Sequence, residues 1–520
     1  MHAPKLKEVL HLSKEYNLIP VYREIWADTE TPIRVFHHFY DEPRAFLLES
    51  VEGGMTWARY SFIGMDPFMV IKGKNGHIHI ETKTGVRQES GRPIETIRHL
   101  LRAYKSPDIK DLPRFTGGAV GFFGYDLLKY YEQLPQHRID DLNMNDLEFM
   151  FCDSVIAFDH FRQRVIVISN MHVPKSGDEA AIEKAYLETC AKIDRLVERL
   201  KHPKFVSPLG LDSVTDDVEL EGCRSNVTKE EFIRRVERAK AYIDTGEVLQ
   251  VVLSQRFEID TRIEPLLVYR VLRSLNPSPY MYVLKLDGQV IVGTSPELLV
   301  RVEGDRVLTR PIAGTRPRGM TREQDEALER ELLADQKERE EHLMLVDLGR
   351  EDIGKVSEIG SVRCDRLMQV ERYSHVMHLV SNVSGKLRAD KDGFDALLAC
   401  LPAGTVSGAP KQRAMEIIAE LESEARGAYA GAIAYLGFSG NIDSCITIRT
   451  IIFKDGKAYV QVGAGIVKNS VPEKEYEETV NKAKGMLKAI KLAETMLPPR
   501  EQLGTVTNQD YYYSAGGSNA

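Results

Sequence analysis

Residues 431–467, GAIAYLGFSGNIDSCITIRTIIFKDGKAYVQVGAGIV, decide the fold class of this chain. Three apolar segments, 431–438, 443–453 and 458–467, are separated by the short polar sequences SGN and KDG. Apolar runs joined by glycine-containing turns predict an antiparallel meander of three strands. The rest of the 520-residue chain has no regular alternation of strand and helix patterns. An α+β protein with large, mainly antiparallel β-sheets is therefore favoured over a doubly wound fold.

Strand and helix patterns outside this stretch are short and local. Strands are expected at 46–51, 68–73, 153–171 and 248–259, and helices at 94–104 and 178–201. Three more helices have capping signals at their starts, which are Thr228 with Glu231, Thr321 with Gln324, and Ser470 with Pro472 and Glu473. We expect the second of these helices to run unbroken to Gly349.

A polar, acidic segment of weak periodicity, 205–222, separates the two halves of the chain. We predict from it an N-terminal domain at 1–220, a second domain at 221–495 and a C-terminal tail at 496–520. The tail ends in YYYSAGGSNA and is expected to be flexible.

Composition limits the classes of function. The formal net charge is −8, whereas a nucleic-acid-binding surface is normally basic, so no nucleic-acid partner is expected. No run approaches the roughly 18 apolar residues of a membrane span, and the N-terminus has no apolar signal core, so no membrane partner is expected. The six cysteines are scattered without CxxC pairs, which is typical of a reducing compartment. We predict a cytoplasmic protein.

Two pairs of glutamates are the first candidates for chemistry. Glu338 and Glu341 are three residues apart, as are Glu475 and Glu478, so each pair shares one face of a predicted helix. Lys482 extends the second face by one turn. Each pair taken alone is typical of a solvated helix face. If the two pairs converge, their hard oxygen ligands suit Mg²⁺, which retains several waters.

Several stretches are suited to binding anions. Residues 309–319, TRPIAGTRPRG, hold three arginines in a chain stiffened by two prolines. Thr405 lies in LPAGTVSGAPKQRAMEII (401–418), where the N–H groups at a helix start suit an anion, although a plain N-cap loop explains the same sequence. Arg449, in an otherwise apolar strand, needs an anionic partner if it is buried. The glycines of 462–467 mark a close approach by a backbone or a ligand.

Two residues are candidate acid–base groups. Glu297 follows a proline turn at a predicted strand end, in GTSPELL (293–299), where a turn carboxylate in water is the alternative. His378 lies in ERYSHVMHLV (371–380), and a lone histidine there is commonly a hydrogen-bonded core residue. The chain has no GxSxG elbow, Walker A sequence or Rossmann GxGxxG unit. These patterns together indicate a site of anion clamps, Mg²⁺ carboxylates and acid–base groups.

A series of motifs occurs in the order typical of one family. They are GTSPE, PIAGTRPRG, EHLMLVDLGR, RYSHVMHLV, GTVSGAPK, YAGAIAYLGF, CITIRT, VQVGAGIV and EETVNKA, dense over residues 225–490. Together they resemble the chorismate-utilising enzymes, most closely those of the anthranilate synthase branch. The resemblance implies the family's fold, in which the sheets pack as a sandwich with helices on the outside. LLES (47–50) and TGGAVGFFGYD (116–126) resemble the family's regulatory region.

The resemblance also implies a reaction. Ammonia attacks ring carbon 2 of chorismate while the 4-hydroxyl leaves, and loss of pyruvate then gives anthranilate, in the first committed step of tryptophan biosynthesis. Glu297 is the expected general acid, His378 is associated with the elimination, and Thr405 supports the ring or the leaving group. Chorismate is expected to bind Gly314, Thr315, Tyr429, Arg449, Gly463, Ala464, Gly465 and Lys482, with the arginines of 309–319 raising the positive potential. Mg²⁺ is expected between Glu341 and Glu478, with Glu338 and Glu475 serving its waters.

Two positions separate the branches of the family. Aminodeoxychorismate synthases resemble this chain but carry a lysine nucleophile where it has Ala313. Isochorismate and salicylate synthases use a lysine base at the position of Gln250, and an amide cannot take a proton from water at neutral pH. Two alternatives stay open. One is an aminodeoxychorismate synthase, which Ala313 opposes, and the other is a non-catalytic tryptophan- or chorismate-binding regulatory subunit.

The resemblance implies a partner and an inhibitor. None of the six cysteines lies in a GxCxG glutaminase elbow, so a separate glutamine amidotransferase subunit is expected to supply ammonia, which makes the enzyme a hetero-oligomer. Feedback inhibition by L-tryptophan is expected as well. The implied inhibitor-binding residues are Glu49, Ser50, Pro279, Tyr280 and Met281, although a strand end and a proline turn explain the same sequences.

Overall fold

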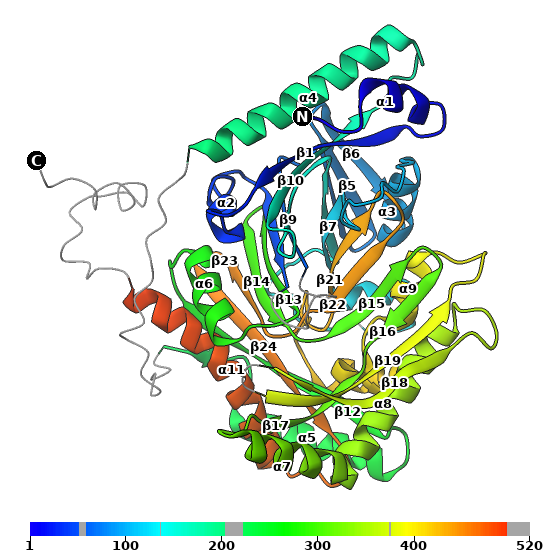
Figure 1. Ribbon diagram of the computed structural model, residues 1–520. Coiled ribbons are helices and arrows are strands. Elements are labelled where there is room, and N and C mark those ends of the chain that lie inside the picture. Colours follow the sequence, from blue (N-terminus) through cyan, green and yellow to red (C-terminus); the bar gives the residue numbers. More distant parts are fainter. Residues whose placement is uncertain (51–58, 136, 203–221, 374–375, 497–520) are drawn as a thin grey trace, which may run out of the picture.

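Two large sheets form the framework of the computed structural model (Figure 1). The structure describes residues 1–50, 59–135, 137–202, 222–373 and 376–496. The first sheet has the order β1 (Leu18–Trp26), β10 (Arg164–His172), β9 (Ser154–Asp159), β3 (Tyr60–Met65), β2 (Ala45–Glu49), β13 (Tyr280–Leu286), β14 (Gln289–Ser295), β23 (Thr450–Lys454), β24 (Lys457–Ile466), β12 (Gln250–Asp260) and β11 (Arg224–Ser225), with β20 (Gly408–Ala409) beside β12. The second has the order β17 (Ile312–Pro317), β19 (Val376–Lys386), β16 (Arg306–Thr309), β15 (Leu298–Glu303), β22 (Ile442–Ile446), β21 (Ala432–Gly437), β7 (Gly118–Phe123), β8 (Leu147–Cys152), β4 (Met69–Lys74), β5 (His77–Thr82) and β6 (Gly85–Ser90), with β18 (Arg363–Arg372) beside β19. All pairings between these strands are antiparallel.

The two sheets pack face to face around a shared core. Phe46 and Tyr282 of the first sheet lie in one buried cluster with Phe122 and Met150 of the second. Helices cover the outer faces, with α4, α6 and α11 on the first sheet and α3, α8 and α9 on the second. The prediction of an α+β sandwich with antiparallel sheets and helices outside is confirmed.

The α-helices have between 6 and 24 residues. They are α1 (Leu6–Leu12), α2 (Pro32–His37), α3 (Pro93–Arg102), α4 (Glu179–Lys201), α5 (Lys229–Asp244), α6 (Pro265–Leu275), α7 (Arg322–Ala334), α8 (Gln336–Gly354), α9 (Gly393–Cys400), α10 (Lys411–Leu421) and α11 (Pro472–Thr495), with 3₁₀ turns η2 (Tyr125–Tyr130) and η3 (Gly404–Val406). In the described part of the chain, no helix combines the length and the apolar character needed to cross a membrane.

The stretch 431–467 forms two hairpins instead of one meander. β21 pairs with β22 in the second sheet, and β23 pairs with β24 in the first. The single strand expected at 443–453 is therefore wrong, because residues 447–449 carry the chain from one sheet to the other. Arg449 turns this corner with φ of +52°, in the left-handed region that costs a non-glycine residue roughly 1 kcal/mol. Apolar periodicity misses the break because the strands on both sides are buried.

Two expected helices differ from the prediction, one in its length and one in its start. The helix expected from Thr321 to Gly349 is broken at Asp335, which separates α7 from α8 and caps α8 by accepting a 3.2 Å hydrogen bond from the Glu338 N–H. The capping box expected at Ser470 does not form in the described start of α11, where Val471 is the N-cap without a side-chain bond. The Ser470 hydroxyl instead accepts a hydrogen bond from the Val467 N–H. The caps at Thr228 and Thr321 are confirmed.

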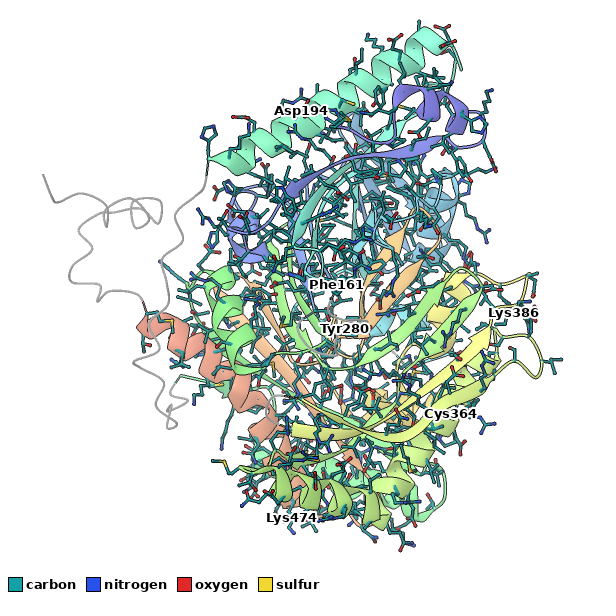
Figure 2. All side chains as sticks on the ribbon, viewed as in Figure 1. Phe161, Asp194, Tyr280, Cys364, Lys386 and Lys474 are labelled. Carbon is teal, nitrogen blue, oxygen red and sulfur yellow. The ribbon has the colours of Figure 1, made fainter. Side chains whose placement is uncertain are left out.

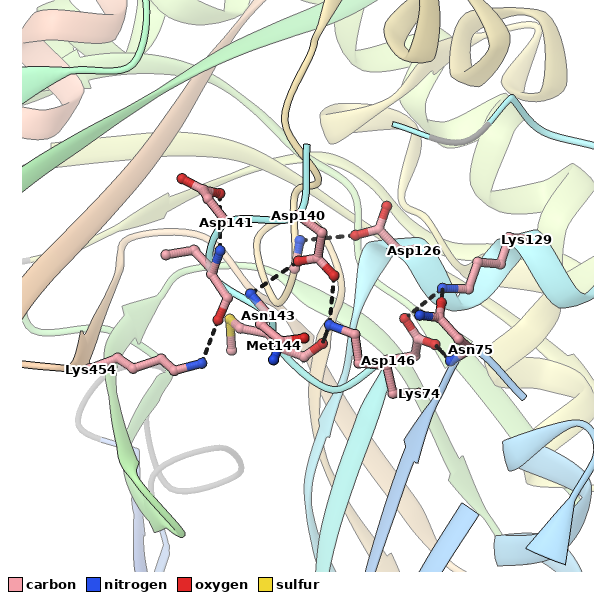
Figure 3. A network of polar contacts seen from close by, with 12 residues as sticks. Lys74, Asn75, Asp126, Lys129, Asp140, Asp141, Asn143, Met144, Asp146 and Lys454 are labelled. Carbon is pink, nitrogen blue, oxygen red and sulfur yellow. Dashed lines mark hydrogen bonds and ion pairs between the residues drawn. The ribbon is translucent and has the colours of Figure 1, made fainter. Parts of the chain in front are cut away.

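Both sheets contain strands from both halves of the chain. β2 pairs with β13, and β7 pairs with β21. Figure 3 shows a polar network that adds to these links, in which Lys74 donates to Met144 O at 2.8 Å and Lys454 donates to Leu142 O. The expected boundary segment, 205–222, lies outside the described residues except for Gly222, and so does the tail beyond 496. The division into domains stays a prediction.

Candidate functional site

Helices α8 and α11 bring the two glutamate pairs together. Burial and then repulsion from Glu338 raise the pKa of Glu341, and Glu478 on the other helix adds to the rise. Burial also raises the pKa of Glu475, with a further contribution from Glu478. Lys482 Nζ lies 2.6 Å from Glu478 Oε1. The four carboxylates thus share one neighbourhood, with a lysine at its edge.

These carboxylates fit a magnesium ion. Within the described ranges, no group of three or more His, Cys, Asp or Glu side chains is arranged to hold a metal by itself. Mg²⁺ ordinarily takes one or two protein carboxylates and completes its shell with substrate oxygens and water, so Glu341 and Glu478 are a sufficient protein contribution. A dication would also relieve the repulsion that raises the pKa of Glu341.

Arg449 and Tyr429 lie beside the carboxylates. The Arg449 side chain is accessible, but the surrounding protein lowers its pKa by desolvation, and Tyr429 and Glu478 oppose that change. Tyr429 is 6% exposed, and burial raises its pKa to about 12. Among the described residues, no carboxylate forms an ion pair or hydrogen bond with Arg449, so its desolvated guanidinium is suited to an anionic ligand.

The glycines of β24 have close side-chain neighbours. A Cβ on Gly463 would lie 2.6 Å from Tyr429 Oη, and one on Gly465 would lie 2.5 Å from Gln250 Nε2. The Lys482 ammonium donates a 2.9 Å hydrogen bond to Gly463 O, which links this strand to α11. Ala464 points into a buried cluster instead, so it offers only its backbone to a ligand.

Strands β17 and β19 place His378 opposite Thr315. His378 Nδ1 lies 2.9 Å from Gly314 O and 3.1 Å from Thr315 Oγ1. A proton on Nδ1 donated to the carbonyl leaves Nε2 as the basic atom of the ring. Gly314 has φ of +66°, and a Cβ there would lie 3.3 Å from Glu338 Oε2, so this part of β17 reaches the glutamates of α8.

Glu297 follows β14 and is half-buried. Burial raises its pKa to about 7, although a 3.0 Å hydrogen bond from Thr405 Oγ1 lowers it. Its carbonyl accepts a 3.0 Å hydrogen bond from the Ile446 N–H, which fixes the backbone. A small cavity of about 40 Å³ touches Glu297 and Thr405 and is lined otherwise mostly by apolar groups, including Leu348 of α8. A carboxyl group that titrates near neutral pH in such surroundings can donate a proton.

The arginines of residues 309–319 are neutralised by protein carboxylates. Their partners are Glu371 for Arg310, Glu331 and Asp335 for Arg316, and Asp325 for Arg318. Arg310 also lines the cavity at Glu297, and the expectation that these arginines raise the positive potential at the chorismate site stays a prediction. Their ion pairs fix β17 and Gly314 within it. Sequence alone does not reveal these pairs, because the acidic partners are distant along the chain or on the next helix.

The predicted residues form three neighbouring groups. The first is Glu297 with Thr405, the second is His378 with Gly314 and Thr315, and the third comprises Tyr429, Arg449, Gly463, Gly465, Lys482 and the glutamates Glu341, Glu475 and Glu478. α8 borders all of them, since Leu348 lines the cavity at Glu297 while Glu338 and Glu341 reach the others. Among the described residues, no hydrogen bond joins Glu297 to His378.

A separate cavity of about 100 Å³ collects the residues predicted to bind an inhibitor. Glu49, Ser50, Pro279, Tyr280 and Met281 all line it. β2 and β13 form its wall, with Met281 opposite Glu49. Figure 2 marks Tyr280 near the middle of the molecule, between the two sheets.

Charged groups at this cavity include a pair that sequence reasoning missed. Arg301 Nη2 lies 2.6 Å from Asp443 Oδ2, and both residues line the cavity. Glu49 is 5% exposed, and burial raises its pKa even though Arg273 lies 3.2 Å away. The Tyr269 hydroxyl donates a 2.6 Å hydrogen bond to the same carboxylate. The available signal for the missed pair is a charged residue inside each of two largely apolar strands, β15 and β22.

A model of the chorismate-binding enzymes matches residues 45–488. The chain belongs to this family. Anthranilate synthase component 1 of Acetivibrio thermocellus is 53% identical over 498 residues, which cover 95% of this chain and 99% of that protein. The protein of the same name from Aquifex aeolicus is 47% identical over 492 residues, covering 94% and 98%. The crystal structure of anthranilate synthase component I from Streptococcus pneumoniae has a TM-score of 0.72 at 38% identity and covers 89% of this chain and 99% of that one.

The motif-based resemblance is thereby confirmed, both for the family and for the branch. In this chorismate-binding enzyme, the two positions that separate the branches lie in the walls of the site. Gln250 is 8% exposed on β12 and faces Gly465. Ala313 lies on β17, next to Gly314 and opposite Leu379.

Proposed function

We propose that this chain is the chorismate-aminating subunit of an anthranilate synthase. The observation that carries the proposal is a site with anion-binding and acid–base groups in which Gln250 and Ala313 stand where related branches use lysine. Ammonia is already a nucleophile and needs neither a lysine base nor a lysine nucleophile. Water activation and covalent attack, by contrast, need those side chains.

The residues divide the chemistry between them. Arg449 and Tyr429 bind the enolpyruvyl carboxylate beside Gly463, and Gly314 and Thr315 lie along the ring. Glu297, with its pKa near 7, protonates the 4-hydroxyl as it leaves while ammonia bonds to ring carbon 2. Pyruvate is then eliminated as the ring becomes aromatic, and Nε2 of His378 is the candidate base for the proton lost from ring carbon 2.

Glu341 and Glu478 would hold Mg²⁺, with Glu338 and Glu475 bonding to its waters. When bound, the ion supplies a Lewis acid that neutralises the ring carboxylate. Lys482 contacts both Glu478 and Gly463. It therefore holds this part of α11 against β24, the strand that carries Gly463.

The second cavity is part of the same proposal. L-Tryptophan is a zwitterion with an apolar ring, and the cavity offers the Arg301–Asp443 pair and aromatic walls that include Tyr280, while the Glu49 carboxylate in its wall is held by Tyr269 and Arg273 of α6. β22 borders this cavity at Asp443 and ends at Ile446, whose N–H donates to the Glu297 carbonyl. A shift of β22 on inhibitor binding would therefore reach the general acid.

The component 1 relatives imply a second component, and we propose that it is a glutamine amidotransferase subunit that supplies ammonia in a hetero-oligomer. A cytoplasmic location fits the six free thiols. The N-terminal part to residue 220 and the part from 221 to 495 would divide inhibitor sensing and catalysis between them, although strands of both build the inhibitor cavity.

Product identification tests this function. Purified chain is incubated with chorismate, Mg²⁺ and ammonium at alkaline pH, and the products are separated by chromatography. Anthranilate with an equal amount of pyruvate is the expected outcome. An aminodeoxychorismate product with retained enolpyruvyl group would replace the proposal with the related branch, and tight chorismate binding without turnover would replace it with a regulatory subunit.

A further inference from the structure

Arg426 is a fully buried arginine whose role no motif explains. It follows α10, and its exposed fraction is 0%. Nε donates a 2.8 Å hydrogen bond to Glu422 Oε2, and Nη2 donates one of 2.7 Å to Glu422 Oε1. Such two-pronged pairs hold the guanidinium plane in one orientation.

The remaining donors of Arg426 reach two parts of the candidate site. Nη1 donates to Val406 O at the end of η3, and Nη2 donates to Val252 O on β12, both at 2.8 Å. Val252 is the strand partner of Gly465. Arg426 Cζ also lies 5.5 Å from the centre of the Tyr429 ring. The planar guanidinium of Arg426 therefore fixes the positions of η3, β12 and Tyr429 relative to one another.

Glu422 is fixed from its other side as well. It is 4% exposed, and its Oε1 accepts hydrogen bonds from Ser254 N at 2.7 Å and from Ser254 Oγ at 3.0 Å. Ser254 is the strand partner of Gly463. The groups that face the ion pair from the neighbouring elements are Tyr125, His137 and Tyr429. A buried pair with all of these bonds has a single arrangement, which suits it to specifying geometry.

We propose that Arg426, clamped by Glu422, is a positioning residue that holds the Thr405 hydroxyl against Glu297. This inference rests on the proposed function. The route is short, because Arg426 holds Val406 O and the preceding residue, Thr405, donates its 3.0 Å hydrogen bond to Glu297 Oε1. η3 is a single turn, so a displaced Val406 carbonyl moves the adjacent hydroxyl.

Arg426→Lys tests the proposal, because lysine keeps the charge and loses the planar fork. We expect kcat to fall about 100-fold, the typical cost of a displacement of 1 Å in an active site. Both Arg426→Lys and Thr405→Val should move the alkaline limb of the kcat/KM profile to higher pH, because the Thr405 hydrogen bond lowers the pKa of Glu297. In a double-mutant cycle, the variant that combines Arg426→Lys with Thr405→Val should lose no more kcat than the more damaging of the two single variants.

Arg235→Lys is the matched control, since Arg235 is 7% exposed, pairs with Glu231 on α5 and, within the described part of the chain, forms no hydrogen bond or ion pair with a candidate group. A purely structural role would give Arg426→Lys the same result as the control, which is a lower Tm with unchanged kcat and pH profile, and this would overturn the proposal. If the losses of kcat in the two single variants multiply in the double variant, the proposal is also overturned. If Arg426→Lys does not fold, Glu422→Gln takes its place, because the amide keeps one acceptor oxygen for the guanidinium. Failure of the proposed function can be distinguished from failure of this proposal, because the unmodified chain would then make no anthranilate.

Discussion

Lys482 Nζ lies 2.6 Å from Glu478 Oε1, and the same ammonium donates a 2.9 Å hydrogen bond to Gly463 O. This lysine connects the α11 carboxylate to the glycine strand that lies beside Tyr429. The candidate metal site and the candidate anion site are thereby linked through one side chain.

The carboxylate on α11 provides the first prediction. Glu478→Gln should lower Mg²⁺-dependent turnover by at least about 100-fold, whereas Glu475→Gln should cost about 10–100-fold, as is typical for groups that bond to a metal's outer ligands. Activity is measured across a Mg²⁺ titration. The exposed neighbour Glu477→Gln is the control and should leave the titration unchanged. Near-normal activity in Glu478→Gln would remove the metal assignment.

Glu297 is predicted to control the pH dependence of the reaction. As a general acid with a pKa of about 7, it is active when protonated, so kcat/KM should fall as the pH rises above 7. Glu297→Gln should lower kcat/KM by roughly 10²–10⁴-fold and abolish this alkaline limb. If the alkaline limb persists in Glu297→Gln, it arises from another titrating group. That result would count against Glu297 as the general acid.

The same carboxyl group should also affect stability. Its folded-state pKa of about 7 lies above the usual 4.5, so folding is penalised increasingly as the pH rises from 4.5 to 7 and fully above that range. The shift corresponds to roughly 3 kcal/mol in the free energy of unfolding. Glu297→Gln should therefore be more stable than the unmodified chain at pH 8, with the gain disappearing by pH 4. Urea unfolding at pH 8 and pH 4 measures this gain in stability. An equal gain at both pH values would contradict the raised pKa of the Glu297 carboxyl group.

Gly463 provides a steric prediction. Gly463→Ala places a Cβ 2.6 Å from Tyr429 Oη, so the tyrosine or the strand must move. The KM for chorismate should rise by about 10–100-fold, since a small displacement of a binding group has an effect of that size. Gly354→Ala on α8, where a Cβ has no neighbour within 4 Å, is the control and should keep the KM.

Ser50 provides a prediction for the second cavity. Ser50→Phe adds a ring at the wall of a cavity of only about 100 Å³, which leaves little room for an amino acid with an indole side chain. The inhibition constant for L-tryptophan should rise at least about 10-fold while kcat stays unchanged, because one lost ring contact is worth several-fold or more in affinity. Ser90→Phe, at an exposed position of β6, should leave inhibition intact. Unchanged inhibition in Ser50→Phe would place the inhibitor elsewhere.

Sequence patterns predicted the sheets because their apolar runs are long and bounded by glycine turns. They failed at residues 447–449, where the chain changes sheets without a change in hydrophobicity, and at Asp335, where one residue splits a continuous helical pattern. The first break depends on tertiary packing and the second on a single capping residue, and neither changes the local period.

The candidate site was predictable where the motif resemblance named a residue, as for Glu297 and Thr405, which the structure places 3.0 Å apart. The arginines of 309–319 show the opposite case. Their charge suggested a ligand, yet Arg316 lies 2.7 Å from Asp335 and serves the protein's own framework. Arg426 was missed because its four polar contacts come from segments distant in sequence as well as from Glu422 nearby.

The most direct test of the central claim is the fluorescence of anthranilate formed by the unmodified chain alone. Chorismate, Mg²⁺ and ammonium are supplied at alkaline pH, and EDTA is added during the time course. The account predicts a steady rise in fluorescence that stops on chelation and resumes with excess Mg²⁺. Chorismate consumption without any anthranilate signal, or a rate indifferent to chelation, would contradict it.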